Sequence, residues 1–364
     1  MNCETPNTVD NIYRLAEELK IPERRVIDFS TPSNSLGVSK KIKAELRKHL
    51  KYLHNYPDPE AKRLRKQIGK FHGADAEMVI CGSDRMELLS LTVRALQPGR
   101  VLIAGPYDSK YEKTCILSGA EAVWYDAEDR DSLAIDADDF IAFFRAHAPS
   151  MIVLGNPDGL TGISLEKEDI QKIADAAKEL KSQLIIDEAF MDFCPENTII
   201  GEVVENPFLI VLRTMSFFYA LAGLGIAYGV FPRKIAESLR TVQGPCAVNS
   251  LAQRAAVIAL KDDVYRKETS LTVRREKQFL ERGFRKLGID FLGSDVNFYL
   301  LKMDKAVEVY QRLRKRGLLL GYFLYNKEPD NMYLRAAVKT HKANAALIKE
   351  LSMLLQGQNS IIRQ

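Results

Sequence analysis

The sequence predicts an α/β fold, with a mainly parallel sheet in a large domain and a smaller α+β domain after it. From about residue 80 onward, short apolar runs alternate with segments of helical periodicity. Such alternation is typical of parallel strands joined by helices that cover both faces of the sheet. After about residue 245 the pattern changes to a long helical stretch followed by a few strands separated by helices.

Five apolar runs of the large domain are interpreted as buried strands. They are continuous rather than alternating, as expected for strands covered on both faces. In chain order they are RVLIAG (100–105), EAVWYD (121–126), SMIVLG (150–155), QLIIDE (183–188) and FLIVLR (208–213). The segment LEKEDIQKIADAAKELK is predicted to be a helix, because it places Ile170, Ile173, Ala174 and Ala177 on one face.

Three parts of the chain are expected. Residues 1–45 form an N-terminal segment that packs with the small domain, and residues 46–245 form the large domain. Residues 246–364 form a long linking helix and the small domain, with strands at VNFYLLKM, LLLGYFLY and MYLRAAVK, a helix at AVEVYQRLRKRG and a final helix.

Composition excludes several classes of function. The net charge of +4 is small for 364 residues, so it gives no argument for nucleic acid. The apolar stretch 217–230 is shorter than the roughly 20 residues that span a bilayer, and the first 15 residues do not resemble a secretory signal. The five cysteines are scattered and the five histidines show no metal-ligand spacing. We therefore expect a cytoplasmic protein with no metal site and no membrane partner.

Polar residues at the strand ends are the first candidates for a site, because ligands of parallel sheets lie outside the carboxyl ends of the strands. These candidates are Asn156, Asp187, Arg213 and Thr214.

Eight segments, in order, resemble the pyridoxal phosphate (PLP) enzymes of fold type I, the aspartate aminotransferase fold. The nearest resemblance is to threonine-phosphate decarboxylases and histidinol-phosphate aminotransferases. The segments are IDFSTPSNSLG, NYPDPEAKRLRKQIGKFHG, GNPDGLTG, IIDEAFMDF, RTMSFFYALAGLGIAYGV, GPCAVNSLA, VNFYLL and YLRAAVKTHKANAALI. The resemblance covers nearly the whole chain and implies a large domain with a seven-stranded type of sheet.

The resemblance also implies roles for single residues. Asp187 would face the pyridine nitrogen of PLP, Asn156 would bond the ring hydroxyl, and Tyr107 would stack on the ring. Tyr56 would reach the cofactor phosphate of a neighbouring subunit, which implies a dimer. Arg335 would clamp a substrate carboxylate. Further positions that match are Ser83, Asp84, Thr214 and Ser216 for the cofactor, and Asn34 for the substrate.

Each of these residues also has a purely structural interpretation. Asp187 could cap a turn, and Asn156 before Pro157 could serve only turn chemistry. Tyr56 and Tyr107 could be interface or core aromatics. Arg335 could pair with a surface carboxylate.

Four positions depart from the family pattern. Phe217 stands where the resemblance expects the lysine that forms the Schiff base with PLP, and there is no lysine between Lys181 and Lys234. Gly225 and Gly321 stand where arginines are expected. The phosphate cradle of small residues reads GSDRME, in which Asp84 would repel a phosphate and Arg85 could compensate only if it pointed inward.

Three functions remain open. The chain could be a non-catalytic subunit that lends Tyr56 to an active partner, as in heterodimeric members of this superfamily. It could be an active PLP-dependent decarboxylase or aminotransferase for a small phosphorylated amino acid, and the decarboxylase-like motifs would then favour cobalamin biosynthesis. It could also bind a small carboxylate as a sensor through Arg335. The four departures favour a protein whose Schiff-base chemistry is lost.

Overall fold

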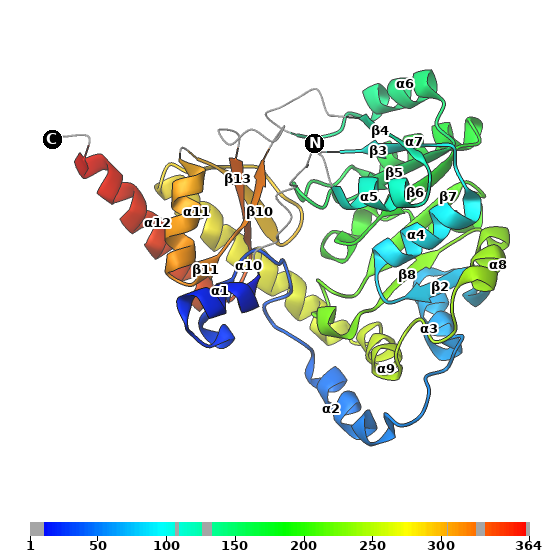
Figure 1. The fold of residues 1–364 in the computed structure, drawn as a ribbon, viewed down its shortest axis with the longest axis horizontal. Coiled ribbons are helices and arrows are strands. Elements are labelled where there is room, and N and C mark those ends of the chain that lie inside the picture. Colours follow the sequence, from blue (N-terminus) through cyan, green and yellow to red (C-terminus); the bar gives the residue numbers. More distant parts are fainter. Residues whose placement is uncertain (1–10, 106–108, 126–132, 304, 325–331, 362–364) are drawn as a thin grey trace. The chain divides into compact units, whose positions relative to one another are not determined.

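The computed structural model describes residues 11–105, 109–125, 133–303, 305–324 and 332–361 (Figure 1). The chain forms two compact units. The large unit is Leu36–Thr269, and the small unit combines Met1–Ser35 with Ser270–Gln364. Residues 36–45 and 246–269 thus belong to the large unit, because the helices within them contact each other there.

The large unit contains a seven-stranded sheet, in agreement with the predicted fold class. Five neighbouring strands are parallel, and one strand near the edge runs antiparallel to both of its neighbours. In spatial order the strands are β2 (Val79–Gly82), β8 (Ala227–Val230), β7 (Leu209–Thr214), β6 (Gln183–Asp187), β5 (Met151–Gly155), β3 (Arg100–Ala104) and β4 (Glu121–Tyr125). All five runs that were interpreted as strands are strands.

Helices cover both faces of this sheet. The helices are α2 (Lys40–His49), α3 (Lys62–His72), α4 (Arg85–Leu96), α5 (Ser109–Leu117), α6 (Ala137–His147), α7 (Lys167–Glu179), α8 (Arg233–Val242) and α9 (Ser250–Ala259). Short 3-10 turns lie at η2 (Leu50–Tyr52), η3 (Ala76–Met78), η4 (Met191–Phe193), η5 (Pro195–Asn197), η6 (Ile200–Val204) and η7 (Ala222–Leu224).

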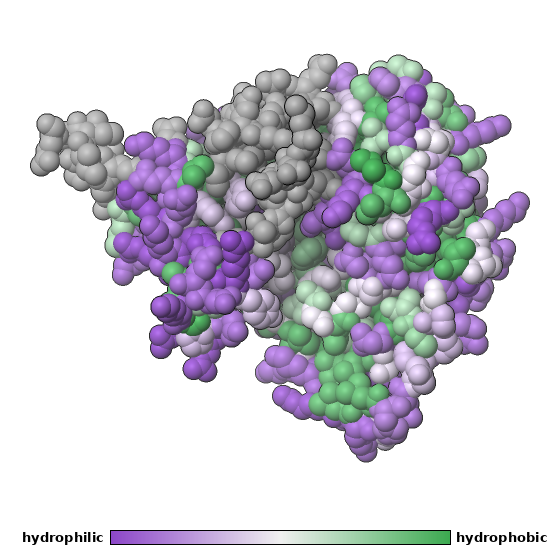
Figure 2. All heavy atoms as spheres, viewed as in Figure 1, coloured by the Kyte–Doolittle hydropathy of each residue, from purple (hydrophilic) through white to green (hydrophobic). Residues whose placement is uncertain are grey.

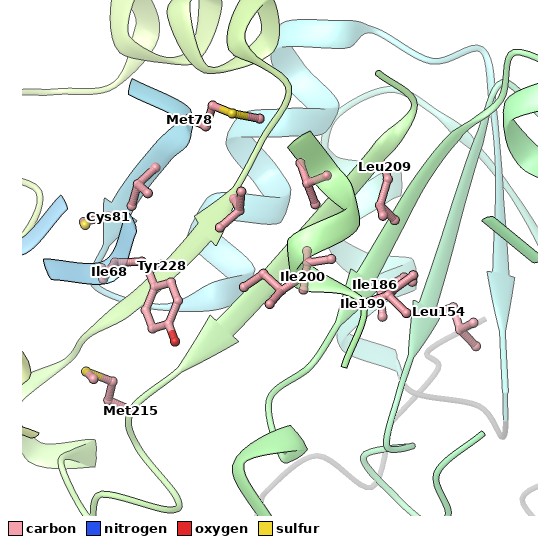
Figure 3. Close-up of a cluster of buried hydrophobic side chains, with 14 of the residues drawn as sticks. Ile68, Met78, Cys81, Leu154, Ile186, Ile199, Ile200, Leu209, Met215 and Tyr228 are labelled. Atoms are coloured by element: carbon pink, nitrogen blue, oxygen red, sulfur yellow. The ribbon is translucent and has the colours of Figure 1, made fainter. Parts of the chain in front are cut away.

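Alternate strand residues divide the interior of the large unit into two clusters, because successive side chains of a strand point to opposite faces. Ile152 and Leu154 of β5 lie in the cluster that includes buried residues of α2, α3, α6, α7 and α9. Figure 3 shows part of this cluster, including Leu154. Met151 and Val153 lie in the cluster that includes buried residues of α4, α5 and α8. The predicted face of α7 is buried in the first cluster.

The small unit is built on a four-stranded antiparallel sheet with the order β12-β13-β10-β9 and a separate two-stranded pair, β1 with β11. Its strands are β1 (Ile27–Asp28), β9 (Asp290–Phe291), β10 (Phe298–Lys302), β11 (Leu318–Leu319), β12 (Gly321–Leu324) and β13 (Met332–Ala337). Its helices are α1 (Ile12–Leu19), η1 (Glu23–Arg25), α11 (Ala306–Lys315) and α12 (His341–Ile361).

The expected long helical stretch after residue 249 is two helices, α9 and α10 (Asp263–Lys286), so the prediction of continuity was wrong. The break is held by buried Asp262, whose Oδ1 accepts a hydrogen bond from Lys41 Nζ at 2.7 Å. Arg266 Nη1 donates to the carbonyl of Leu260 at 2.9 Å, at the end of α9. Side chains rather than Gly or Pro therefore end the first helix.

The described part of the chain contains neither a membrane-spanning helix nor a metal-binding cluster. No described helix combines the length and the apolar character needed to cross a membrane. Likewise, no three His, Cys, Asp or Glu side chains among the described residues are placed to hold a metal ion together.

Gly229 in β8 offers a test of how tightly the sheet packs. A Cβ at this position would lie 2.5 Å from Phe231 Cε2 and 2.8 Å from Leu212 Cδ2. We expect Gly229→Ala to lower the free energy of unfolding by about 1–3 kcal/mol through overpacking. Gly244→Ala is the matched control, because nothing lies within 4 Å of its Cβ. Equal urea midpoints for the two variants would contradict this account of the core.

Candidate functional site

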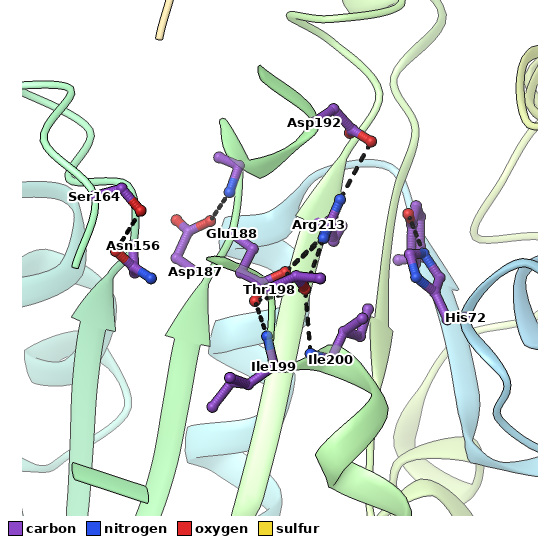
Figure 4. Close-up of polar contacts among 12 residues, drawn as sticks. His72, Asn156, Ser164, Asp187, Glu188, Asp192, Thr198, Ile199, Ile200 and Arg213 are labelled. Atoms are coloured by element: carbon purple, nitrogen blue, oxygen red, sulfur yellow. Dashed lines mark hydrogen bonds and ion pairs between the residues drawn. The ribbon is translucent and has the colours of Figure 1, made fainter. Parts of the chain in front are cut away.

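The candidate site lies at the carboxyl ends of β5, β6 and β7. Asn156 follows β5, Asp187 is the last residue of β6, and Thr214 is the last residue of β7. All three are at most 2% exposed. The structure therefore brings together the polar strand ends that the sequence singled out. Figure 4 shows Asn156 and Asp187 at the ends of neighbouring strands.

Asp187 is held by two donors from the helices on one face of the sheet. Arg85 Nε, at the start of α4, donates to Asp187 Oδ2 at 2.6 Å. The hydroxyl of Tyr111 in α5 donates to the same oxygen at 2.6 Å. Burial lowers the pKa of Arg85, but Asp187, Tyr111 and Asp84 together outweigh burial, and the net effect is a raised pKa. The pair is thus a buried ion pair.

Arg85 points inward, but toward Asp187. The sequence left open whether this guanidinium faces a phosphate cradle, and the contact with Asp187 could not be read from residues that lie 102 positions apart. Tyr111 was missed altogether. The available signal was the second tyrosine of GPYDSKY; the first one, Tyr107, lies outside the described residues.

The N-terminus of α4 is capped by carboxylates of its own chain. Asp84 Oδ1 accepts from the backbone N–H of Met86 at 2.7 Å. Glu87 Oε2 accepts from the backbone N–H of Ser83 at 2.7 Å and from its hydroxyl at 2.6 Å. Helix N-termini attract anions through such N–H groups. Here Asp84 caps the helix and Glu87 binds the N–H just before it, and Glu87 was not among the predicted site residues.

Gly225 lies against the same N-terminus. Its φ is +61°, and a Cβ there would lie 3.4 Å from the backbone oxygen of Ser83. A side chain at position 225 would therefore begin beside the cradle, which fits the resemblance that places an arginine there. The glycine supplies no cation.

Phe217 packs in a stacked pair with Phe190. The ring centroids are 4.4 Å apart and the ring planes differ by 13°. Phe190 follows the end of β6 and is 3% exposed. Aromatic stacking at this distance is favourable. The position that the resemblance gives to a lysine is thus occupied by an apolar ring with an apolar neighbour.

Thr214 and Ser216 form hydrogen bonds with each other. Thr214 Oγ1 donates to Ser216 Oγ at 3.0 Å, and the backbone N–H of Ser216 donates to Thr214 Oγ1 at 3.2 Å. These contacts fix the turn that follows β7 and leads to Phe217.

Among the described residues, the side-chain oxygen of Asn156 has a hydrogen-bond partner, whereas its side-chain nitrogen has none. Its Oδ1 accepts from the backbone N–H of Leu165 at 2.8 Å, which supports the turn-forming interpretation. Its Nδ2 is buried and has no hydrogen-bond partner among the described residues. A buried donor without an acceptor is costly. Among the described residues of the site, this atom is the group that fits a ligand oxygen.

Arg213 is a structural residue of the core. It is 2% exposed, and its Nη2 lies 2.7 Å from Glu188 Oε2. Its Nη1 donates to Asp192 Oδ1 at 3.2 Å, and its Nη2 donates to Thr198 Oγ1 at 2.9 Å. Figure 4 shows Arg213 between these acidic residues, which belong to the IIDEAFMDF motif. Buried ion pairs with Arg213 therefore hold the motif to β7.

Tyr56 stands on the surface of the large unit, with 92% of its area exposed. It lines a groove of about 540 Å³ with residues of α2, α3 and α9. Tyr56 is therefore not a core aromatic, and its role at an interface stays a prediction.

Asn34 and Arg335 belong to the small unit. Asn34 is buried. Arg335 Nη2 donates to the carbonyl of Ser30 at 2.9 Å, and its guanidinium lies 5.5 Å from the centre of the Phe298 ring. Gly321 pairs directly with Arg335 across the sheet, and a Cβ at Gly321 would lie 3.3 Å from Arg335 Nε. The absence of a side chain at position 321 thus gives the Arg335 side chain its room.

Residues 24–351 match the family model of aminotransferase class I and II. Threonine-phosphate decarboxylase of Salmonella typhimurium is 28% identical over 353 residues, which cover 95% of this chain and 96% of the relative. Histidinol-phosphate aminotransferase of Thermoanaerobacter sp. strain X514 is 31% identical over 300 residues, which cover 82% of this chain and 84% of the relative.

Solved structures agree in fold. Histidinol-phosphate aminotransferase from Clostridium acetobutylicum has a TM-score of 0.83 and 26% identity, covering 91% of this chain and 100% of its own. Histidinol-phosphate aminotransferase from Sinorhizobium meliloti, solved in complex with pyridoxal-5'-phosphate, has a TM-score of 0.85 and 20% identity, covering 98% of this chain and 99% of its own. At that identity the likeness shows the fold alone.

The Arg85–Asp187 pair makes the site sensitive to single substitutions. Asp187→Asn leaves a buried guanidinium without its counter-charge, and we expect the free energy of unfolding to fall by about 3 kcal/mol. Arg85→Met should cost a similar amount for the opposite reason. The double variant should be more stable than the sum of the single effects, by about 2 kcal/mol, in urea denaturation. Additive effects would show that the two side chains do not interact.

His72 in α3 gives a pH test. Its Nε2 lies 2.9 Å from the Tyr228 hydroxyl, and burial, reinforced by the charge of Arg213, lowers the pKa of His72 to about 3. The unfolded chain binds a proton at this residue near pH 6.5, but the folded chain does not. Stability from this group is therefore present above about pH 6.5 and is lost as the pH falls, by about 1.4 kcal/mol per pH unit.

The measurement compares the free energy of unfolding of the wild type and of His72→Gln between about pH 7 and pH 5. Gln keeps an acceptor for Tyr228 but does not titrate. The variant should therefore have the shallower pH slope, and parallel slopes would mean that His72 is protonated equally in both states.

Proposed function

The chain belongs to the class I and II aminotransferase family, and from this premise we propose that it is a member whose Schiff-base chemistry is lost and that it acts as a non-catalytic subunit. Members of this family use PLP, and a related structure contains it. When bound, PLP supplies an electron sink whose pyridine nitrogen is kept protonated by a carboxylate.

The observation that carries the proposal is the ion pair between Arg85 and Asp187. By resemblance, Asp187 is the carboxylate that would hold the pyridine nitrogen. One of its oxygens accepts from both Arg85 and Tyr111 at 2.6 Å. A protonated ring nitrogen would have to displace the guanidinium or lie beside it, and two adjacent buried cations repel each other strongly.

The start of α4 supports the same proposal. A cofactor phosphate would meet the carboxylates of Asp84 and Glu87, which already accept the N–H groups of Met86 and Ser83. Gly225 contributes no positive charge beside it. Burying a phosphate among carboxylates, without a compensating cation, is unfavourable.

Phe217 supports the chemical half of the proposal. A lysine amine would form the covalent bond to PLP and would move a proton at the substrate carbon. A phenyl ring can do neither, and this ring is stacked on Phe190. The residues of the site as a whole therefore do not fit PLP.

The subunit role rests on Tyr56 and on the family. Family members are typically homodimers. Tyr56 is 92% exposed beside a groove, as required of a side chain that would reach into a neighbouring subunit. We propose that this chain pairs with a second subunit and lends Tyr56 to it; a small carboxylate bound through Arg335 is a further ligand that the family resemblance suggests.

One observation favours the alternative, an active PLP-dependent decarboxylase or aminotransferase for a small phosphorylated amino acid. Asn156 Nδ2 is buried and has no acceptor among the described residues. By resemblance, its acceptor would be the ring hydroxyl of PLP. In that case the similarity to threonine-phosphate decarboxylase would favour a place in cobalamin biosynthesis.

The test is retention of PLP. The purified chain is incubated with PLP and exhaustively dialysed, its absorbance spectrum is recorded, and any Schiff base that survives dialysis is then fixed with borohydride. We expect no visible absorbance band and no lysine peptide carrying a pyridoxyl adduct, because Phe217 provides no amine. The threonine-phosphate decarboxylase of Salmonella typhimurium, treated in parallel, is the positive control.

A stoichiometric adduct on any lysine of this chain would overturn the proposal and favour the active alternative. Stoichiometric PLP that is held without an adduct would leave the loss of Schiff-base chemistry intact, but it would refute the argument from Arg85 and Glu87. Arg85→Met separates the two arguments, because it removes the cation paired with Asp187 but adds no amine that could form a Schiff base.

A further inference from the structure

A cavity beside β2, at the edge of the seven-stranded sheet, contains two arginines. Its volume is about 330 Å³, which is within the size range of small-molecule sites. Arg65 of α3 and Arg240 of α8 both line it. Figure 2 shows hydrophilic and hydrophobic residues mixed over the part of the large unit where Figure 1 places α3 and α8. Such a mixed surface differs from the large apolar patch that is typical of protein docking.

The two arginines share one carboxylate. Arg65 Nη2 lies 2.8 Å from Glu77 Oε1, and Arg240 Nη1 lies 3.3 Å from Glu77 Oε2. Among the described residues, no other carboxylate lies within ion-pair distance of either guanidinium. Burial and then the charge of Arg65 lower the pKa of Arg240, and the acidic groups Glu77, Glu237 and Glu60 do not fully offset them. Two positive charges beside the cavity thus face one close negative charge.

Two guanidinium nitrogens have hydrogen-bonding capacity left. Arg240 Nε and Arg65 Nη2 are buried and have no hydrogen-bond partner among the described residues. Arg65 Nη2 is close to Glu77, but this contact is an ion pair without the geometry of a hydrogen bond. Buried donors without acceptors are costly. A ligand with two adjacent oxygens would satisfy both nitrogens.

Both guanidinium groups are also held in place by the backbone. Arg65 Nε donates to the carbonyl of Ala76 at 3.0 Å, and Arg240 Nη2 donates to the carbonyl of Glu77. The side chain of Arg65 is only 8% exposed. The two cations are therefore positioned by the fold, and a ligand would not have to order them.

The carboxylates that line the cavity are already engaged. Asp58 Oδ1 accepts the backbone N–H of Glu60 at 3.1 Å, and Asp58 Oδ2 accepts that of Lys62 at 2.8 Å. Glu60 Oε2 lies 3.3 Å from Lys62 Nζ. These two acidic groups therefore stabilise the start of α3, and they do not form ion pairs with Arg65 or Arg240.

The rest of the wall is apolar or neutral. Val79, Ile80 and Val248 contribute aliphatic side chains. Gln243 Nε2 donates to the carbonyl of Cys81 at 2.9 Å and is thereby tied to the edge strand. An apolar wall opposite a fixed cation suits a ligand with one charged end and an apolar body.

We propose that this cavity binds a small monocarboxylate with an apolar body, whose two oxygens accept hydrogen bonds from Arg65 and Arg240. A single negative charge balances the excess positive charge. A phosphate dianion would exceed it and would place its further oxygens against apolar side chains. The inference goes beyond the proposed function and does not rest on it, since none of the lining residues is assigned to the cofactor or the substrate.

The test uses butyrate as the probe. Equilibrium dialysis measures the binding of radiolabelled butyrate to the full chain at constant ionic strength, with butyramide and inorganic phosphate as competitors. Arg240→Met removes one cation of the cavity. Ala247→Phe narrows the cavity without changing its charge, and it serves also if Arg240→Met fails to fold.

Two variants are controls. Arg233→Met removes an arginine of the same helix that pairs with Asp75 and does not line the cavity. Arg335→Met removes the cation of the small unit that the family resemblance assigns to a carboxylate. Urea midpoints show that each variant is folded before binding is measured.

We expect saturable binding of butyrate that Arg240→Met and Ala247→Phe each weaken by at least about tenfold. Arg233→Met and Arg335→Met should leave the dissociation constant unchanged. Butyramide should not compete, because it has no charge, and phosphate should compete less well than butyrate.

Four results would overturn the proposal. They are an absence of saturable binding, equal affinity of the wild type and both cavity variants, competition by butyramide or phosphate as strong as that by butyrate, and loss of binding in Arg335→Met alone. The last result would place the carboxylate in the small unit. PLP takes no part in these measurements, so this proposal and the proposed function can fail independently.

Discussion

Two adjacent carboxylates at the end of β6 determine the arrangement of the site, because each is buried and each is neutralised by an arginine. Asp187 is paired with Arg85 from α4, whereas Glu188 is paired with Arg213 from β7. Successive side chains of a strand point to opposite faces, so one pair ties the strand end to the helices of one face and the other ties it to the neighbouring strand. Removing either partner would leave an uncompensated buried charge. The IIDEAFMDF motif is thus maintained by electrostatics even without a ligand.

Most described groups of the site likewise have a hydrogen-bond, ion-pair or stacking partner within the chain. Asp187 accepts from Arg85 and Tyr111, Glu87 accepts from Ser83, and Phe217 stacks on Phe190. Each contact satisfies a group that the family resemblance assigns to a cofactor or places beside one. Asn156 Nδ2 is the exception that the described residues offer. A site of this kind is complete as a structure, and this is why we interpret it as a scaffold.

The sequence predicted the fold well and the contacts of the site poorly. The five strands and the apolar face of α7 were predicted because continuous apolar runs and helical periodicity are local signals. The positions of Asn156, Asp187 and Thr214 followed from the rule for strand ends. The partner of Arg85 and the role of Glu87 depend on side-chain direction, which local pattern does not encode. The break between α9 and α10 was missed because buried Asp262, without Gly or Pro, marks it.

The carboxylates at the start of α4 bear on whether the folding of the protein depends on a bound cofactor. Helix N-termini need acceptors for their free N–H groups, and a chain that takes those acceptors from a bound phosphate depends on that ligand for part of its folding energy. Asp84 supplies one such acceptor internally, and Glu87 binds the N–H of Ser83 just before the helix. Under the proposed function, the amount of folded protein in a cell would therefore not follow the vitamin B6 status of that cell, whereas the amount of a catalytic partner would.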